Sequence, residues 1–370
     1  MLAIFAHEKC HLTMMKAAVF KRPYLVQTIE KEKPALINPT DVLVKVRFSG
    51  LCGSDLHYYR GHIPLKPDNT MGHEFLGTVV ETGSGIHAED FSIGDDVIAT
   101  FTIQCGECWY CTHGYSGTCD RTNTFGKPGL QGGQAEFVLV PFANSTLVKK
   151  PKSDENFDES VYVLMADIFV TAYYGVKKIM DHFTTDVDVS TISVLQIGAG
   201  PVGLCAVRIL RHFGFESIVV VDGIEDRLNH AKALGASATV NYVHELSKLD
   251  ILKRTLTGDR GFDAALEIVG TGSALKTAFE TVRRGGFISS VGMGHEPLPF
   301  DALEAYVKCV TISFGRCNAW SLFKEALRVF ESLKSDLTDL IDVKCHISEA
   351  EEYYSKFERG EVKKVVFVFS

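Results

Sequence analysis

Four cysteine thiols lie within fifteen residues of this chain, at Cys105, Cys108, Cys111 and Cys119. The spacing C-x2-C-x2-C-x7-C allows one short loop to fold around a single tetrahedral ion, and four thiolates at about 2.3 Å are typical of zinc. An iron–sulfur cluster is the main alternative, because C-x2-C-x2-C also occurs in cluster proteins, and disulfides are the third. Cluster motifs usually continue as Cys-Pro, whereas Cys119 precedes Asp120, which favours zinc. A closed four-sulfur site is structural, so the chemistry must lie elsewhere.

A second group of reactive side chains begins at Cys52, in the segment Cys-Gly-Ser-Asp-Leu-His. This segment brings Ser54, Asp55 and His57 within a turn or two of a possible thiolate ligand. A lone cysteine is most often a core residue. Here a hydroxyl, a carboxylate and an imidazole lie close to the cysteine in sequence, which instead suggests an open catalytic metal site. Such a site needs three protein ligands and one free position.

Further ligand types occur at His73, Glu74 and Asp167. Neighbours on an extended segment point to opposite faces, so His73 and Glu74 are not both expected to sit comfortably in the first coordination sphere. Asp167 is an acid at an otherwise apolar helix start, where a carboxylate is costly unless it is paired or bound to a metal. Thr171 follows four residues later on the same helical face, where it could touch a nicotinamide ring.

A nucleotide-binding turn is predicted from Val194 to Gly203, which reads strand, glycine turn, helix start. Gly198 would allow the tight turn, Gly200 would let the backbone approach a pyrophosphate, and Gly203 would let helix and sheet pack closely. The helix N-terminus would supply N–H groups to the phosphates. The residues expected to bind the cofactor are Thr171, Gly198, Gly200, Pro201, Val202, Gly203, Asp222, Arg227 and Val291.

The choice between NAD and NADP depends on Asp222, which ends the second strand of this unit. Its carboxylate would bind the two ribose hydroxyls and repel the extra phosphate of NADP. Arg227 could sit over the adenine and soften that preference, or could be an ordinary surface residue of a helix. NAD is therefore the predicted cofactor, with NADP as the alternative.

The elements around these motifs predict two kinds of domain. Between residues 42 and 148 the apolar segments are short and β-branched, whereas after Asp158 apolar strands alternate with helices, as in a doubly wound α/β sheet. The predicted strands are 15–20, 42–46, 77–80, 96–99, 192–197, 217–221, 264–268, 287–291 and 364–369. The predicted helices run through 172–174 and over 226–234, 273–282, 321–333 and 348–357, and the C-terminal tail should return to the first domain.

Length, net charge and the distribution of cysteines exclude several classes of protein. A chain of 370 residues should split into about two domains. The net charge of −8 argues against a nucleic-acid surface, and no apolar run is long enough for a membrane span. Five of the ten cysteines (Cys10, Cys205, Cys309, Cys317 and Cys345) are scattered singly, which favours a reducing cytoplasm over a disulfide scaffold. Residues 1–14 do not resemble a signal or transit peptide and are interpreted as an extension.

From Lys16 to Phe369 these motifs, their spacing and their order resemble the zinc-containing medium-chain alcohol dehydrogenases. The resemblance implies an α/β fold with a GroES-like β-rich catalytic domain and a Rossmann cofactor domain. It assigns residues 1–167 and 316–370 to the catalytic domain, with a zinc lobe at about 100–122, and 168–315 to NAD binding. It also implies two zinc ions per chain and a homodimer or homotetramer.

By this resemblance the four lobe cysteines hold the structural zinc, while Cys52, His73 and Asp167 bind the catalytic one. Liver-type enzymes have a second cysteine where this chain has Asp167. Glu74 would lie behind the zinc and exchange with water as a ligand, and Asp55 would fix the ring of His73. The segments 165–175, 126–130 and 314–317 are most similar to the formaldehyde-dehydrogenase-like subgroup.

The expected activity is hydride transfer between a primary or secondary alcohol and NAD. The catalytic zinc would stabilise the alkoxide, and Ser54 would pass the proton through the cofactor ribose to His57. A formaldehyde-type dehydrogenase or dismutase with tightly held NAD, a polyol dehydrogenase and a catalytically silent nucleotide-binding protein are the alternatives. The residues considered for the substrate pocket are Tyr58, Tyr59, Phe101 and Trp109.

Overall fold

The computed structural model describes residues 14–183, 187–294 and 296–369, so the interpretation of residues 1–13 lies outside the described part of the chain. The chain forms two compact units, which are described separately. The first unit comprises Met1–Ala99, Asn123–Pro151 and Val343–Ser370, and the second comprises Thr100–Thr122 and Lys152–Asp342.

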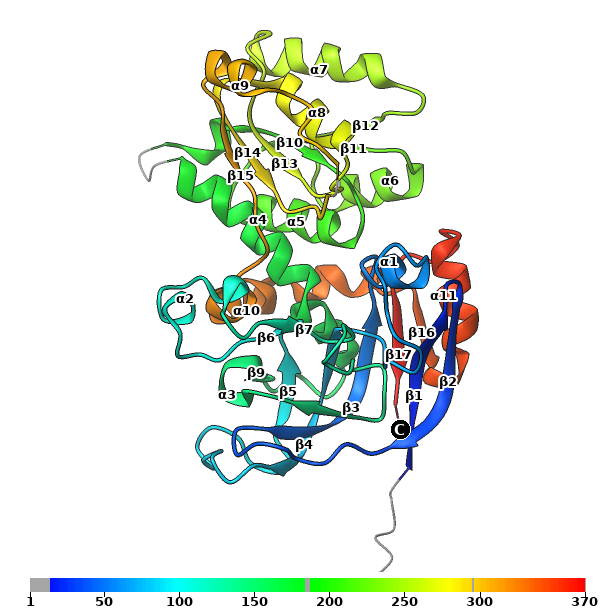
Figure 1. Ribbon diagram of the computed structural model, residues 1–370. Coiled ribbons are helices and arrows are strands. Elements are labelled where there is room, and N and C mark those ends of the chain that lie inside the picture. The colour runs from blue at the N-terminus through cyan, green and yellow to red at the C-terminus, as the bar shows by residue number, and fades with distance from the viewer. Residues whose placement is uncertain (1–13, 184–186, 295, 370) are drawn as a thin grey trace, which may run out of the picture. The chain divides into compact units, whose positions relative to one another are not determined.

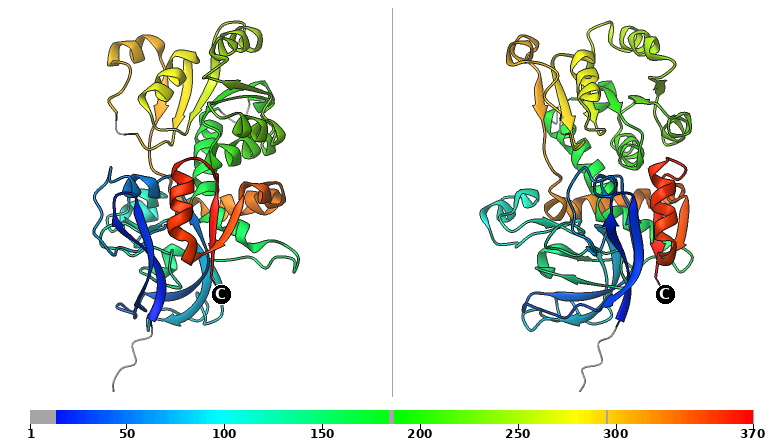
Figure 2. Two further views of the ribbon diagram at one scale, coloured as in Figure 1. Left: turned by 90° about the vertical axis from the view of Figure 1, so that its right-hand side faces the viewer. Right: turned by 45° about the vertical axis from the view of Figure 1, so that its right-hand side comes forward.

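The first unit is built on a mainly antiparallel sheet with the strand order β16-β17-β3-β4-β5-β9, in which β8 also pairs with β3. The bounds are β3 Val42–Leu51, β4 Glu74–Thr82, β5 Asp96–Ala99, β8 Phe137–Val140, β9 Leu147–Lys149, β16 Val343–His346 and β17 Val365–Val368. A separate hairpin pairs β1 (Met14–Arg22) with β2 (Leu25–Glu32). The remaining elements are α1 Asp55–Tyr59, α3 Ala143–Thr146, α11 Ala350–Glu358, β7 Asn123–Thr124 and the 3-10 turn η5 Ile347–Glu349. Helix α11 packs beside β2, as the red and blue ribbons of Figure 2 show.

The register of three strands places the metal-ligand candidates of the first unit. Gly50 near the end of β3 is paired with Glu74 at the start of β4 on one side and with Val366 of β17 on the other. A Cβ on Gly50 would lie 2.0 Å from Oε2 of Glu74. Glycine at this position therefore leaves room for a buried carboxylate between the strands.

The second unit contains a six-stranded parallel sheet in the order β12-β11-β10-β13-β14-β15. The strands are β10 Ser193–Ile197, β11 Ser217–Asp222, β12 Ala238–Asn241, β13 Phe262–Glu267, β14 Val282–Ser290 and β15 Thr311–Ser313. The connecting helices are α4 Ile168–His182, α5 Pro201–His212, α6 Glu225–Ala233, α7 Leu246–Thr257, α8 Gly272–Thr281 and α9 Ala302–Lys308, with the 3-10 turn η3 Val189–Thr191 before β10. Figure 1 shows α4 and α5 on one side of the sheet and α8 and α9 on the other.

This sheet is doubly wound, because the chain starts at the central strand β10, builds outward to β12, and then crosses to β13 and the other edge. The strands β10 and β13 are buried along their whole length, as expected for parallel strands covered on both faces. The strand order reverses between β10 and β13, and such sheets bind ligands at the carboxyl ends of the strands around this point.

The rest of the second unit consists of the cysteine lobe and helical segments before and after the sheet. The lobe contains β6 Thr102–Ile103, α2 Trp109–Thr112 and the 3-10 turn η1 Ser116–Thr118. The other segments are the 3-10 helices η2 Glu159–Ala166 and η4 Lys334–Leu340 and the helix α10 Ala319–Leu333, which packs against η1.

The predicted β-rich domain and parallel α/β sheet are both present, and the named strands and helices overlap observed elements. The C-terminal tail is divided between the two units. β16, α11 and β17 belong to the first unit, whereas α10 belongs to the second. Several elements were not predicted, among them the edge strand β15 and the helices α7 and α9. No helix in the described part of the chain has both the length and the apolar character needed to cross a bilayer.

Candidate active site

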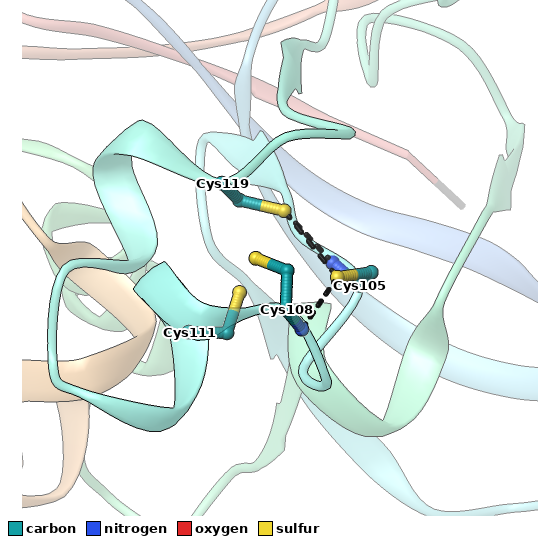
Figure 3. A group of neighbouring side chains, drawn as sticks. All are labelled: Cys105, Cys108, Cys111 and Cys119. Carbon is teal, nitrogen blue, oxygen red and sulfur yellow. Dashed lines mark hydrogen bonds between the residues drawn. The ribbon is translucent and has the colours of Figure 1, made fainter.

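The four cysteines of the lobe come together around one point, as Figure 3 shows. Their sulfur atoms all lie within 4.8 Å of one another, and the sulfurs of Cys105 and Cys119 are 3.6 Å apart. A sulfur–sulfur bond is about 2.05 Å long, so this pair is not a disulfide. Tetrahedral zinc with Zn–S bonds of about 2.3 Å holds its sulfurs roughly 3.8 Å apart, which is close to the observed separation.

Backbone N–H groups in the lobe point at these sulfur atoms. The amides of Cys105 and Arg121 each donate to Sγ of Cys119 at 3.3 Å, and the amide of Cys108 donates to Sγ of Cys105 at 3.3 Å. Such donors favour the thiolate, which is the form that binds metal. The turn is therefore shaped to stabilise negative charge on sulfur.

The ionisation of the lobe cysteines is uneven. Hydrogen bonds from the amides of Asp120 and Cys111 lower the pKa of Cys108 to about 6, whereas burial raises the pKa of Cys111 and of Cys119 above the usual value. Four neighbouring thiols cannot all ionise beside one another without a compensating positive charge. A divalent cation supplies that charge, so the donor set fits a zinc ion.

Hydrogen bonds connect the lobe to the N-terminal end of helix α10. Oδ1 of Asn318 accepts a hydrogen bond from the amide of Gly117 at 3.0 Å, and Oγ of Ser116 accepts one from the amide of Ser321 at 3.2 Å. A Cβ on Gly117 would lie 2.7 Å from the carbonyl oxygen of Cys317. The loop thus reaches α10 closely enough that only glycine fits.

Within the first unit, Cys52, Ser54, Asp55 and His73 form one polar cluster. Nδ1 of His73 lies 3.3 Å from Oδ1 of Asp55, and Oδ2 of Asp55 accepts a hydrogen bond from the amide of Cys52 at 3.0 Å. The hydroxyl of Ser54 lies 3.3 Å from Sγ of Cys52 and 3.3 Å from Nε2 of His73. Asp55 thereby orients the imidazole, and Nε2 and the sulfur face the same hydroxyl.

Glu74 follows His73 in sequence but faces a different partner. Its side chain is 0% exposed and forms an ion pair with Lys364, which is 1% exposed. Nζ of Lys364 also donates to the carbonyl oxygen of Leu51 at 3.2 Å. The ligand atoms of Cys52, His73 and Glu74 nevertheless lie within 4.8 Å of one another. Glu74 is therefore close to the cluster, while its negative charge is compensated by Lys364.

Two residues that support this cluster were not identified from the sequence. The first is Lys364, a lysine at the start of an apolar strand. The second is Tyr354, whose hydroxyl donates to Oε1 of Gln134 at 2.8 Å, while Nε2 of Gln134 donates to the carbonyl oxygen of Gly50 at 3.1 Å. Burial, reinforced by the nearby carboxylate of Asp55, raises the pKa of Tyr354 well above its usual range. The sequence signal for Lys364 was a lysine directly before an apolar strand, and Tyr354 gave none.

The proposed relay residue His57 lies on α1 and is half-buried. Its ring centroid is 6.1 Å from that of His62. Of the residues considered for the substrate pocket, Tyr59 is buried against Tyr354, and Trp109 stacks on His113 within the cysteine lobe. These contacts give Tyr59 and Trp109 packing roles.

In the second unit, Asp167 lies between η2 and α4, at the N-terminus of α4. The hydroxyl of Thr171 donates to Oδ1 of Asp167 at 2.8 Å, so the two residues share a helical face as expected. Sγ of the buried Cys317 lies 3.4 Å from the carbonyl oxygen of Val170. Burial, and then the nearby charge of Asp167, raises the pKa of the Cys317 thiol. Asp167 therefore sits at the edge of an apolar, water-poor environment.

The glycine turn after β10 has the geometry of a phosphate cradle. Gly198 has a φ of +104°, which favours glycine. A Cβ on Gly200 would meet nothing within 4 Å, whereas a Cβ on Gly203 would lie 2.3 Å from the carbonyl oxygen of Gly198. Gly200 thus leaves the helix N-terminus open to a ligand, Gly203 permits close packing, and Pro201 occupies the first turn of α5.

Asp222, at the end of β11, is hydrogen-bonded to the glycine turn. Its Oδ2 accepts a hydrogen bond from the amide of Ala199 at 2.7 Å, and its Oδ1 accepts one from the amide of Ile224 at 2.9 Å. Nη1 of Arg227 lies 4.0 Å from Oδ2 of Asp222. Arg227 is therefore directed toward the carboxylate of Asp222.

Glu267, which was not identified from the sequence, holds the neighbouring loops at the same end of the sheet. Its Oε1 accepts hydrogen bonds from the amides of Val269 and Gly270 at 2.7 and 2.6 Å, and its Oε2 accepts one from Ser290 at 2.8 Å. Its carbonyl oxygen accepts one from the amide of Val291 at 2.9 Å. A single buried carboxylate thus fixes the segment that carries Val291.

Two family models match the chain. Residues 38–152 match the alcohol dehydrogenase GroES-like domain, and residues 201–332 match the zinc-binding dehydrogenase domain. The cysteine lobe and the cluster around Cys52 lie in the first match, and Asp222 lies in the second.

Similar proteins cover nearly the whole chain. The zinc-type alcohol dehydrogenase B of Aspergillus flavus is 40% identical over 353 residues, which are 95% of this chain and 81% of the relative. The structure of alcohol dehydrogenase TADH from Thermus sp. ATN1 is 36% identical with a TM-score of 0.86, covering 96% of this chain and 99% of that one. A structure from Escherichia coli CFT073, described as a short chain alcohol dehydrogenase complexed with NADH, is 26% identical with a TM-score of 0.82, covering 96% of this chain and 100% of that one.

Proposed function

The chain belongs to the zinc-type medium-chain alcohol dehydrogenase family, and we propose that it transfers hydride between a primary or secondary alcohol and NAD. The observation that carries this proposal is the cluster in which Asp55 orients His73 while Ser54 contacts both Cys52 and His73. This arrangement offers a thiolate and an imidazole to a metal and leaves a hydroxyl beside them.

We propose that Cys52, His73 and Asp167 hold a catalytic zinc ion. The sulfur of Cys52 and Nε2 of His73 are suitable donors, and Asp55 keeps the ring of His73 in the orientation that ligation needs. Glu74 is proposed to stay behind the metal, because Lys364 compensates its charge. The lobe cysteines would hold a second, structural zinc.

When bound, the zinc would polarise the alcohol oxygen and lower its pKa, and the nicotinamide would accept the hydride. The hydroxyl of Ser54 is placed to receive the alcohol proton, because it already lies beside both donor atoms of the cluster. His57 is proposed to pass that proton to solvent, since an imidazole can both accept and donate a proton.

NAD is proposed as the cofactor because the carboxylate of Asp222 would repel the 2′-phosphate of NADP, and two further acids follow it in the chain. Asp222 ends β11, and Glu225 and Asp226 occupy the first turn of α6. Arg227 offsets one of these charges. Thr171 and Val291 are proposed to contact the nicotinamide half of the cofactor.

The subgroup, the roles of the domains, the oligomeric state and the cellular location are also part of the proposal. The segments 126–130 and 314–317 support placement in the formaldehyde-dehydrogenase-like subgroup. The functional division into residues 1–167 and 316–370 for catalysis and 168–315 for the cofactor follows the family resemblance, as does a homodimer or homotetramer. A cytoplasmic location is supported by the need to keep the ligand thiols reduced.

The proposal is tested by loading the protein with zinc and following reduction of NAD and NADP with a panel of primary, secondary and polyhydric alcohols. We expect turnover with NAD and a simple primary or secondary alcohol. Preferred turnover of a polyol would favour the polyol alternative, and NAD retained through purification would favour the formaldehyde-type alternative. No turnover with either cofactor across the panel would contradict the proposal.

Replacing Asp222 by alanine should raise the KM for NAD by roughly 10- to 100-fold with a smaller change in kcat, because a hydrogen bond that a charged group accepts from a ligand is worth about 1.5–3 kcal/mol. The same change removes the repulsion of a 2′-phosphate, so the ratio of kcat/KM for NAD to that for NADP should fall. Steady-state kinetics with both cofactors measure this. Glu216→Ala, which removes an exposed acid directly before the start of β11, is the control. An unchanged ratio in Asp222→Ala would exclude Asp222 as the discriminating residue.

A further inference from the structure

An aromatic ring occupies the space beside Gly223, the residue that follows Asp222. A Cβ on Gly223 would lie 2.9 Å from both Cζ and Oη of Tyr242. The φ of Gly223 is not positive, so the backbone conformation does not demand glycine there. The missing side chain instead makes room for the ring of Tyr242, which comes from the end of the neighbouring strand β12.

The turn that carries Tyr242 is fixed by hydrogen bonds on both sides of the residue. The amide of Tyr242 donates to the carbonyl oxygen of Asp222 at 3.2 Å, and the amide of Val243 donates to Oδ1 of Asn241 at 3.1 Å. Nδ2 of Asn241 donates in turn to Oε2 of Glu225 at 3.1 Å. Tyr242 therefore projects from a turn whose backbone is tied to β11 and α6.

Although its turn is held in this way, Tyr242 is 56% exposed. The neighbouring Ile224 is 45% exposed and Val243 is 58% exposed. A large aromatic side chain that is held in place but left open to solvent provides a flat apolar surface for a ligand. At this point of the sheet it lies immediately beside the carboxylate of Asp222.

The chemistry of that carboxylate identifies the ligand. In a doubly wound sheet with a glycine turn, the acid that ends the second strand binds the ribose of the adenosine half of the cofactor. The adenine base is joined directly to this ribose, so it must lie close to Asp222. Planar bases stack on aromatic rings, and Tyr242 is the aromatic side chain that the described contacts bring next to Gly223.

We propose that Tyr242 is the surface on which the adenine of the dinucleotide stacks, and that Gly223 is glycine in order to admit this ring. The inference rests on the proposed function, because it assumes that a dinucleotide binds at the glycine turn. It assigns to one side chain the affinity for the adenosine half of the cofactor, separately from the ribose selectivity of Asp222.

The test uses two halves of the cofactor as probes, with binding to zinc-loaded protein measured by calorimetry. Tyr242→Ala should weaken ADP-ribose binding by roughly 5- to 100-fold, as expected for the loss of one base–aromatic stack. Tyr242→Phe should bind ADP-ribose within about twofold of the parent protein, because the stacking face remains. Reduced nicotinamide mononucleotide should bind all variants equally.

A further variant separates stacking from simple filling of space. Tyr242→Leu still covers Gly223 but has no aromatic face, so it should weaken ADP-ribose binding as Tyr242→Ala does. Tyr306→Ala removes another exposed tyrosine, which precedes the opposite edge strand β15, and should change nothing. ADP-ribose affinity that is normal in Tyr242→Ala and Tyr242→Leu would overturn the proposal while leaving the proposed function intact. A parent protein that binds neither ADP-ribose nor NADH would instead overturn the proposed function, and this inference with it.

Discussion

Replacing Asp167 by alanine should leave one zinc ion per chain instead of two and should lower kcat/KM for the alcohol about a thousandfold. The physical reason is that polarisation of the substrate oxygen by a metal contributes several kcal/mol, and about 4 kcal/mol corresponds to a thousandfold change in rate. Loss of one of three protein ligands should release the catalytic ion. The remaining zinc should stay in the cysteine lobe, which contains its own four ligands.

Zinc content by atomic spectroscopy and steady-state kinetics measure the two effects. Asp167→Asn separates ligation from local structure, because an amide oxygen still accepts the hydrogen bond from Thr171 but is a weaker ligand. Asp167→Cys should recover zinc and part of the activity, since a thiolate is a zinc ligand. Asp181→Ala, at an exposed position on the same helix, is the matched control. Two zinc ions per chain in Asp167→Ala would contradict the proposed ligand set.

Replacing Cys111 by serine should release the structural zinc and destabilise the second unit without removing a catalytic ligand. Trp109, Tyr110 and Tyr115 of the lobe are exposed, which leaves the lobe little apolar core of its own. The proposed metal ligation would therefore supply much of its stability. A loss of about 4 kcal/mol would lower the Tm by about 10 °C in a unit of this size. The contacts between Gly117 and α10 should be lost with it.

Thermal unfolding followed by circular dichroism and zinc content measures this effect. Cys309→Ser is the matched control, because Cys309 is an exposed single cysteine outside the lobe. The catalytic zinc should remain in Cys111→Ser at temperatures where the protein stays folded. An unchanged Tm together with two zinc ions per chain would show that the lobe does not depend on a metal held by Cys111.

The sequence predicted best those features whose partners are close in the chain. The lobe cysteines need only one short loop to meet, so their spacing already indicated a tetrahedral site. The glycine turn is equally local, and the roles predicted for Gly198 and Gly203 match the positive φ and the tight helix–strand approach in the structure. The parallel sheet followed from continuous apolar runs, because burial on both faces leaves a composition signal.

Partners far apart in the chain could not be found in this way. Lys364 and Glu74 are separated by 290 positions and meet because Gly50 pairs with both β4 and β17. A shift of one residue in either pairing would turn these side chains to the opposite face, and no periodic pattern in the sequence reports such a register. The same holds for Tyr354, which reaches Gln134 across 220 positions.

What the sequence by itself determined is the donor chemistry: four thiols in one loop, a glycine turn after a buried strand, and an acid at the end of the next strand. Tertiary structure alone decided how these groups are held and what surrounds them. It paired Glu74 with the buried Lys364 and placed the ring of Tyr242 over Gly223. The reason is physical, since residue type and local spacing fix which bonds a group can form. Strand register and burial fix which partner it actually meets.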